Sequence, residues 1–390
     1  MKRVISDMTR VGVVTAVATA AVLAPARLLP KATPATPTPQ AELLHVESVG
    51  PLELTGSMGV AINDKNEIVG TAFGDDEVRA FVVRNRRGEL LPLPKGAPFS
   101  AATGINAKGD VVGVIGNEEN VRGTVWAGNK PGVLTSGKRD TMATTISGSG
   151  VAAGVAFDNQ GRKISFYQMR LQFLNLGLGA YPTVSDGSVW ETNFRMFTNL
   201  PTQALDNGFS GMLWSKPGDG KAIGEFVPQS GNASGTLVGL TIGKSGPVPA
   251  AFKNGKIGTL PVMGGLQMAI PMAANERDIF VGAGISEERM VKPIGWSKGK
   301  TGELPVPGSK QGLALGINDN NQVVGVIETE GGEAHAAVWS GGKVIDLNDV
   351  IDGREGWTLV QARGINNKGF VVGTGVKDGK VGAFVVGPVK

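Results

Sequence analysis

Several residue types that carry chemistry are scarce or missing in this chain. Its 390 residues include no cysteine, which excludes disulfides, thiolate metal sites and a cysteine nucleophile. The two histidines, His45 and His335, stand alone, whereas zinc sites and histidine-based triads need grouped imidazoles or a neighbouring nucleophile. There is also no GxSxG nucleophile elbow, HExxH pair or phosphate-binding loop. We therefore predict no catalytic residues, no metal and no cofactor, and the sequence favours a non-enzymatic protein.

Charge is also sparse, whereas glycine is abundant. Charged residues make up 18% of the chain, and the formal net charge is only +4. Lys2, Arg3 and Arg10 against Asp7 supply half of that charge, so nothing in the balance points to nucleic acid as a partner. The 59 glycines recur at fixed places between valine-rich runs. This pattern is typical of short strands joined by tight turns.

The first 42 residues differ in composition from the rest. Residues 1–26 combine a basic start with a run of small and apolar residues and two A-x-A-like cleavage sites, which predicts a signal peptide. An uncleaved anchor is the alternative, although the run is short for a bilayer. Residues 27–42 are rich in Pro, Thr and Ala and predict an extended linker. We expect an extracellular, periplasmic or cell-surface protein with no transmembrane domain in its mature form.

Internal repetition dominates the remaining sequence. Four segments are nearly interchangeable: AINDKNEIVGTA from Ala61, GINAKGDVVGVI from Gly104, GINDNNQVVGVI from Gly316 and GINNKGFVVGTG from Gly364. Three weaker copies share their phase, and the glycine that ends each Val-Gly pair falls at 70, 113, 154, 239, 282, 325 and 373. The interval of 85 residues between 154 and 239 is twice the others, which predicts a degenerate copy there, with TVSDGSVWETN from Thr183 as the candidate.

Each unit predicts four short strands with period-two patterning and turn residues between them. Four strands in roughly 40–50 residues is the period of a propeller blade. The fold class is therefore all-β: residues 43–390 form a single β-propeller domain of about eight four-stranded blades, with seven as the alternative. The last unit stops after three strands, so we expect the N-terminal segment from Leu43 to close the ring as its fourth strand.

The motifs GINxxGxVVG, AVWSGG and DLN resemble the bacterial HAF family of probable extracellular repeats. The stretch from Ala336 carries the resemblance best, and the similarity extends over residues 43–388. It implies an exported, β-rich repeat protein and implies no activity, because the family is defined by a repeat and not by a reaction.

The repeated residues have structural explanations. The Asn of each Ile-Asn pair is expected to bond the turn backbone two residues on, and the Gly after Val to permit a close approach or a bulge. Trp126, Trp214, Trp296 and Trp339 share one strand position and are expected between blades. Trp357 lies outside that position in a lengthened loop, which leaves both a contact residue and a core residue open.

Charge in the turns between third and fourth strands is positive in every unit, which predicts a basic rim on one face. The candidate binding residues are Arg84, Arg86, Arg87, Lys130, Lys216, Lys253, Lys298, Lys343 and, beyond the rim, Trp357. Two loops between second and third strands, residues 74–79 and 327–335, are acidic and are expected on the opposite face.

These features favour a monomeric binding or surface-interaction module that contacts an acidic polysaccharide or a cell-envelope polymer. Two alternatives stay open. One is a secreted carbohydrate-active enzyme with a site in residues 180–210 or near Trp357, and the other is a purely structural or assembly protein.

Overall fold

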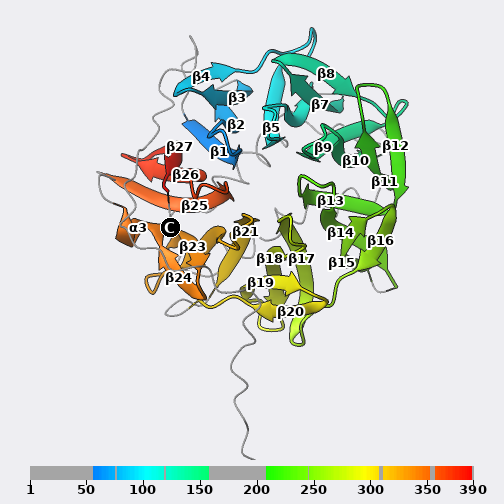
Figure 1. The fold of residues 1–390 in the computed structure, drawn as a ribbon. Helices are drawn as coiled ribbons and strands as arrows, with labels where there is room; N and C mark the ends of the chain where they lie inside the picture. The colour runs from blue at the N-terminus through cyan, green and yellow to red at the C-terminus, as the bar shows by residue number, and fades with distance from the viewer. Residues whose placement is uncertain are drawn as a thin grey trace, which may run out of the picture.

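The chain forms a ring of seven antiparallel sheets around a central axis (Figure 1). The computed structural model describes residues 56–74, 77–117, 120–157, 208–244, 246–306, 311–351 and 356–388. Six of the sheets have four strands, and the last has three in this part of the chain. The all-β propeller is confirmed, but the prediction of eight blades is wrong.

The strands follow one another outward within each blade. Blade one holds β1 (Gly56–Ile62), β2 (Ile68–Phe73), β3 (Val78–Arg84) and β4 (Arg87–Leu90), and blade two holds β5 (Phe99–Ile105), β6 (Val111–Gly116), β7 (Val121–Ala127) and β8 (Lys130–Leu134). Blade three holds β9 (Asp140–Ile146), β10 (Ala152–Phe157), β11 (Phe209–Trp214) and β12 (Gly220–Gly224), and blade four holds β13 (Phe226–Gly231), β14 (Leu237–Gly243), β15 (Gly246–Lys253) and β16 (Lys256–Thr259).

The second half of the ring repeats this order. Blade five holds β17 (Leu266–Ala274), β18 (Phe280–Ser286), β19 (Val291–Ser297) and β20 (Lys300–Glu303). Blade six holds β21 (Gly312–Ile317), β22 (Val323–Glu328), β23 (Ala334–Ser340) and β24 (Lys343–Asp346), followed by the short helix α3 (Leu347–Val350). Blade seven holds β25 (Trp357–Ile365), β26 (Val371–Lys377) and β27 (Lys380–Val386).

The miscount of blades has a clear cause in blade three. β10 pairs directly with β11, so residues 158–208 lie between the second and third strands of one blade. This insertion is about as long as a blade and therefore mimics a missing copy. Leu213 and Trp214, which the sequence assigned to a fourth unit, belong to this third blade. The predicted copy from Thr183 lies outside the described residues.

The core of the ring lies between blades. Second strands such as β2, β6 and β10 are buried along their whole length, whereas the outermost strands, such as β4, are exposed or only half-buried along most of theirs. The four repeated tryptophans are buried, as predicted, and each indole N–H donates to a carbonyl in the segment that leads in from the preceding blade. Burying a large ring with its polar group satisfied makes the packing at these four blades both apolar and specific.

Blade one packs directly against blade seven and completes the ring. Ile68 and Phe81 of blade one share a buried cluster with Val372 and Ala383 of blade seven. The Ala383 amide also donates to the Ser57 hydroxyl at 3.0 Å. The segment from Leu43 that was predicted to add a fourth strand lies outside the described residues, as do residues 1–26 and 27–42.

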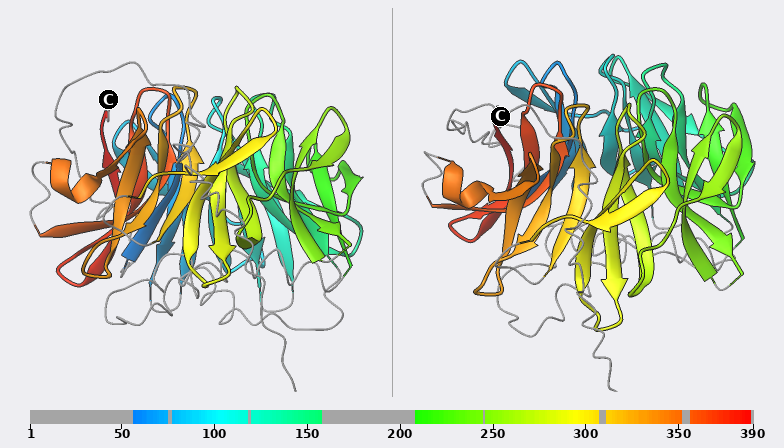
Figure 2. Two further views of the ribbon diagram at one scale, coloured as in Figure 1. Left: turned by 90° about the horizontal axis from the view of Figure 1, so that it is seen from below. Right: turned by 60° about the horizontal axis from the view of Figure 1, so that its bottom comes forward.

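The strands run from one face of the disc to the other, as Figure 2 shows. The turns between first and second strands and the hairpins between third and fourth strands emerge on the same face, which we call the Asn-turn face. Loops between second and third strands emerge on the opposite face. Within the described ranges, no helix is long and apolar enough to cross a membrane.

Candidate ligand-binding face

The repeated asparagines organise the Asn-turn face. In blade one, Asn63 Oδ1 accepts hydrogen bonds from the Lys65 and Glu67 amides, both at 3.0 Å. The same pair of bonds recurs at the asparagines of blades two, five, six and seven, and blade four keeps the second bond. The predicted turn role of these asparagines is confirmed.

Each asparagine amide also reaches the next blade, which the sequence did not indicate. Asn63 Nδ2 donates to the Asn106 carbonyl at 3.0 Å, and Asn366 Nδ2 donates back to the Asn63 carbonyl at 2.9 Å across the closing seam. The remaining donor–acceptor pairs are Asn106 to Ser147, Asn232 to Asn275, Asn275 to Asn318 and Asn318 to Asn366. These buried bonds tie neighbouring blades together around the axis.

Every first strand carries a β-bulge three residues before its asparagine position. A bulge inserts one residue that has no partner on the neighbouring strand. The glycine after Val lies opposite this bulge: at Gly113, an added Cβ would overlap the Ala101 carbonyl oxygen, and the equivalent glycines make equivalent approaches. The predicted close approach is therefore confirmed, and it fixes where the bulge forms.

A cavity of about 330 Å³ opens at the centre of the Asn-turn face. One ring of lining residues is the bulge ring, defined as Val60, Thr103, Thr144, Gln229, Met272, Leu315 and Arg363. A second is the mouth ring, which follows the asparagine position in each blade and consists of Asp64, Ala107, Gly148, Ala233, Glu276, Asp319 and Asn367. Both rings vary from blade to blade within an otherwise repeated framework.

The mouth ring has an acidic side formed by blades five, six, seven and one. The Asn367 amide group donates to Asp64 at 3.0 Å and to Asp319 at 2.9 Å. The Glu276 backbone amide donates to Asp319, and Glu276 in turn accepts from the Ala233 amide. Although three carboxylates converge on a central cavity, each serves as a link between blades.

Arg363 is the one cation of the bulge ring. It keeps some exposure to the cavity while protein surrounds it closely, and this burial lowers the pKa of the guanidinium to about 10. The side chain is therefore still positively charged at neutral pH. The cavity thus combines one buried positive charge in its wall with negative charge at its mouth.

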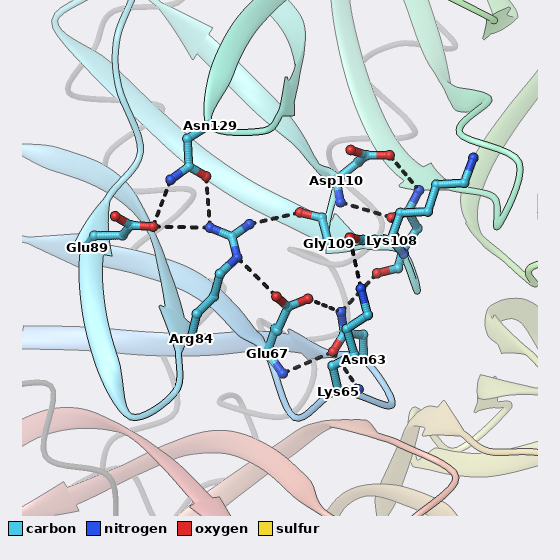
Figure 3. A network of polar contacts seen from close by, with 10 residues as sticks. Asn63, Lys65, Glu67, Arg84, Glu89, Lys108, Gly109, Asp110 and Asn129 are labelled. Atoms are coloured by element: carbon cyan, nitrogen blue, oxygen red, sulfur yellow. Dashed lines mark hydrogen bonds and ion pairs between the residues drawn. The ribbon is translucent and has the colours of Figure 1, made fainter.

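The predicted rim residues separate into two groups. Arg84 is 24% exposed and bonds Glu67 at 3.2 Å, Glu89 at 3.1 Å, the Asn129 side chain at 2.8 Å and the Gly109 carbonyl at 2.9 Å (Figure 3). This network joins blade one to blade two. Lys253 forms an ion pair with Asp278 and joins blade four to blade five in the same way.

The other rim residues are exposed at the outer edge of the same face. They are Arg86, Arg87, Lys130, Lys216, Lys298 and Lys343. Lys130 and Lys343 begin outermost strands of different blades, and neither side chain has a bonded partner among the described residues. We call Lys130, Lys216, Lys298 and Lys343 the lysine rim.

Two other regions were predicted as possible sites: Trp357 and residues 180–210. Trp357 begins β25 and is only 5% exposed, with its ring against Gly375 and Gly382, so the core interpretation holds and the contact interpretation is wrong. Of residues 180–210, predicted as one place for an enzymatic site, residues 180–207 lie outside the described residues. On the opposite face, the loop after β22 exposes Glu333, whose side chain is 70% exposed.

Sequence reasoning missed the bulge ring. A signal was available, because the residue three positions before each asparagine varies freely between otherwise similar units. Variation at this one position does not by itself predict a binding residue, because no sequence pattern marks a bulge. In the described ranges, no group of three or more His, Cys, Asp or Glu side chains is placed to hold a metal ion.

Comparison with protein-family models finds no match, and comparison with curated proteins finds none either. The resemblance to the HAF repeats therefore has no independent support. Known structures match the fold. The propeller domain of the trilobed protease from Pyrococcus furiosus is 10% identical with a TM-score of 0.51, and the match covers 84% of this chain and 93% of that domain.

Two further structures illustrate the breadth of the likeness. A mutant puromycin hydrolase is 11% identical with a TM-score of 0.51 over 82% of this chain, and TolB from Acinetobacter baumannii is 10% identical with a TM-score of 0.43 over 75% of it. This chain spans 50% of the hydrolase and 63% of TolB. At such low identity the matches show a β-propeller and nothing about activity.

Proposed function

We propose that this protein is an exported, non-enzymatic binding module that holds an acidic polysaccharide or envelope polymer along its lysine rim. The observation that carries the proposal is the recurrence of exposed lysines at the same outer hairpins of one face. Repeated cations at regular spacing suit a polymer that presents repeated carboxylates or phosphates.

The distribution of charge across the Asn-turn face supports an edgewise contact. Arg84 and Lys253 are already neutralised by neighbouring turns, whereas no carboxylate among the described residues pairs with the lysine rim. Asp64, Glu276 and Asp319 line one side of the mouth at the centre of the same face. Since like charges repel, an acidic polymer is steered away from the centre and along the edge.

The mouth carboxylates favour binding over hydrolysis. A glycosidase needs two carboxyl groups free to act on either side of the scissile bond. Here Asp64 and Asp319 bond Asn367, and Glu276 bonds the turn of blade four. The oxygens of these carboxylates therefore accept hydrogen bonds that link neighbouring blades, and a catalytic role would require those bonds to break.

The experiment is retention of the purified protein on immobilised acidic and neutral polysaccharides at low and physiological salt. We expect retention on acidic columns alone, with weakening as salt screens exposed charges. The double variant Lys130→Ala/Lys343→Ala should bind about 10-fold more weakly at low salt, because each exposed pair contributes up to about 1 kcal/mol.

A charge-matched control uses two exposed lysines of the opposite face, Lys244 and Lys380. The variant Lys244→Ala/Lys380→Ala changes net charge equally and should keep wild-type retention. Equal weakening by both variants would assign binding to net charge and reject the rim. Absence of retention on every acidic polymer would reject the proposal and favour the structural alternative.

A further inference from the structure

Blade seven is the one described sheet without an outermost strand. β27 pairs with β26 on one side, and no strand of the described ranges pairs with its other side. Such an open edge presents a row of backbone donors and acceptors that can pair with another chain segment. The other six blades show what this edge requires, because in each of them the third strand pairs with an outermost strand.

Blade one shows the geometry that a completed blade seven would have. The Ala80 amide donates to the Ser100 hydroxyl at 2.9 Å, and the Ala383 amide donates to the Ser57 hydroxyl at 3.0 Å. Each serine is the second residue of the next blade's first strand, so Ala80 and Ala383 hold equivalent places. The Ala80 carbonyl also accepts from the amide of Leu91, just beyond β4, at 2.8 Å. Among the described residues, the Ala383 carbonyl has no such partner.

A buried leucine recurs where the outermost strand of a blade ends. Leu134 is 0% exposed and Leu304 is 3% exposed. Leu134 precedes the next first strand by six residues, and Leu304 precedes its own by eight. Residues 48–50 stand at the same distance before Gly56, where β1 begins. Val49 is the only one of these three with a large apolar side chain, so it is the residue that matches the buried leucine.

The residues before Val49 also match the outermost strands. With Val49 in the place of the leucine, Glu47 takes the place of Glu89, which lies opposite Val82 and is 52% exposed. His45 then takes the place of a basic residue that begins the outermost strand in five other blades. Those residues are Arg87, Lys130, Lys256, Lys300 and Lys343. One register therefore matches an apolar, an acidic and a basic position together.

We propose that residues 45–49 form the outermost strand of blade seven, antiparallel to β27. Val49 lies opposite Ala383, Glu47 opposite Val385, and His45 opposite Gly387. The occupied edge continues the seam at which blades one and seven already share a buried cluster. Backbone hydrogen bonds then close the ring, and His45 adds a basic position to the outer edge of the Asn-turn face. The assignment is independent of what the lysine rim binds.

Paired cysteines test the register directly, because the chain has no cysteine of its own. Residues directly opposite each other on antiparallel strands have Cα atoms about 4.5–5.5 Å apart, which a disulfide can bridge. We expect Glu47→Cys/Val385→Cys to crosslink within one chain under mild oxidation, seen on non-reducing gels and as a linked peptide by mass spectrometry. The matched control is Ser48→Cys/Val385→Cys, in which the first cysteine points to the other face of the sheet. It should crosslink at least about 10-fold more slowly.

Amide hydrogen exchange tests the same pairing in the wild-type protein. The Val385 amide faces the open edge, because bonding direction alternates along a strand and the Ala383 amide points to the same side. We expect the Val385 amide to exchange at least about 100-fold more slowly than an unpaired amide. Exchange at the unpaired rate, or equal crosslinking of the two cysteine pairs, would overturn the proposal. A crosslink between two chains would overturn it in favour of a second copy at this edge.

Discussion

Blades two and three make the same connection to the next blade by different means. In blade two, Asn106 Oδ1 accepts from the Lys108 and Asp110 amides at 3.0 and 2.9 Å, and its Nδ2 donates to the Ser147 carbonyl at 3.2 Å. In blade three, Ser147 Oγ accepts from the Val151 amide at 3.1 Å and shares a hydrogen bond with Ser149 Oγ at 2.8 Å, both within its own turn. A serine is too short to reach blade four.

The backbone replaces the missing amide in blade three. The Gly148 amide donates to the Ala233 carbonyl at 3.0 Å. A Cβ at residue 148 would lie 3.3 Å from the Ala233 methyl group, so glycine permits this approach. The comparison shows that each seam between blades needs a hydrogen-bond donor, which can be an asparagine side chain or a backbone amide. Ser147-Gly148 can therefore replace the Asn motif without changing the fold.

The largest expected loss of stability comes from substituting the glycine opposite the bulge, which blades two and three share. Gly113→Ala places a methyl group on the Ala101 carbonyl beside the bulge, and Gly154→Ala does the same at Met142. We expect either to lower the free energy of unfolding by about 3 kcal/mol or more, measured by urea titration. Gly258→Ala, with open space around it, is the control and should change stability little.

The next effect should distinguish the two blades. Asn106→Ala removes four side-chain hydrogen bonds and leaves buried partners unsatisfied, so we expect a loss of about 3 kcal/mol. Ser147→Ala removes two bonds within its own turn and none to the next blade, and should cost about 1 kcal/mol. Equal losses in urea titrations would contradict the view that Asn106 carries the seam and Ser147 does not.

A third kind of seam, between blades six and seven, should depend on pH. His335 Nδ1 lies 2.5 Å from Asp346, and Asn348 beside Asp346 bonds both the amide and the carbonyl of Leu359, each at 2.8 Å. The hydrogen bond to Asp346 raises the pKa of His335. Burial pushes the pKa of Asp346 upward, but the bonds from His335 and Asn348 outweigh it and lower the pKa.

These directions set the pH window of the third seam. The His335 contribution is fully present below its ordinary pKa of 6.5 and is lost as pH rises through the raised pKa. The Asp346 contribution is present above 3.8 and is lost as pH falls through the lowered pKa. We expect His335→Gln to cost about 1 kcal/mol at pH 5.5 and less at pH 8.5, measured by urea titration. A cost independent of pH would contradict the pairing, and Glu225→Gln, at an exposed residue of another blade, is the control.

The smallest effect is a gain. Ser147→Asn should restore two turn bonds and a donor toward the Asn232 carbonyl, making blade three resemble blade two. We expect a stabilisation of about 0.5–1 kcal/mol. An unchanged or lower urea midpoint would show that the Gly148 bond already meets the full need of this seam.

The local structure could be predicted from the sequence because it repeats. Seven copies of one pattern reveal the turn at Asn63, the close approach at Gly113 and the buried Trp126, since each position is constrained in every blade. The blade count failed because spacing alone does not distinguish an insertion after β10 from a decayed blade. The pairing of β10 with β11 shows that the extra residues are an insertion, and strand pairing can be read only from the three-dimensional structure.

The candidate site was harder to predict for a related reason. A count of charges in the hairpins identified Lys130 and Lys343 together with Arg84 and Lys253. However, Arg84 is neutralised by Glu67 and Glu89 of its own blade, and Lys253 by Asp278 of the next blade. Their partners Glu67 and Asp278 belong to other turns, so only the folded ring shows the neutralisation. Arg363 was missed because a bulge residue carries no pattern of its own.

The central claim is that exposed cations at the lysine rim, and not net charge, bind an acidic polymer. The most direct measurement is the affinity of the purified protein for one soluble acidic polysaccharide across a range of salt concentrations. We predict that Lys130→Ala/Lys343→Ala makes the salt dependence shallower and weakens binding, whereas Lys244→Ala/Lys380→Ala reproduces wild type. Identical salt dependence for the two variants, or no binding by the wild type at low salt, would contradict the claim.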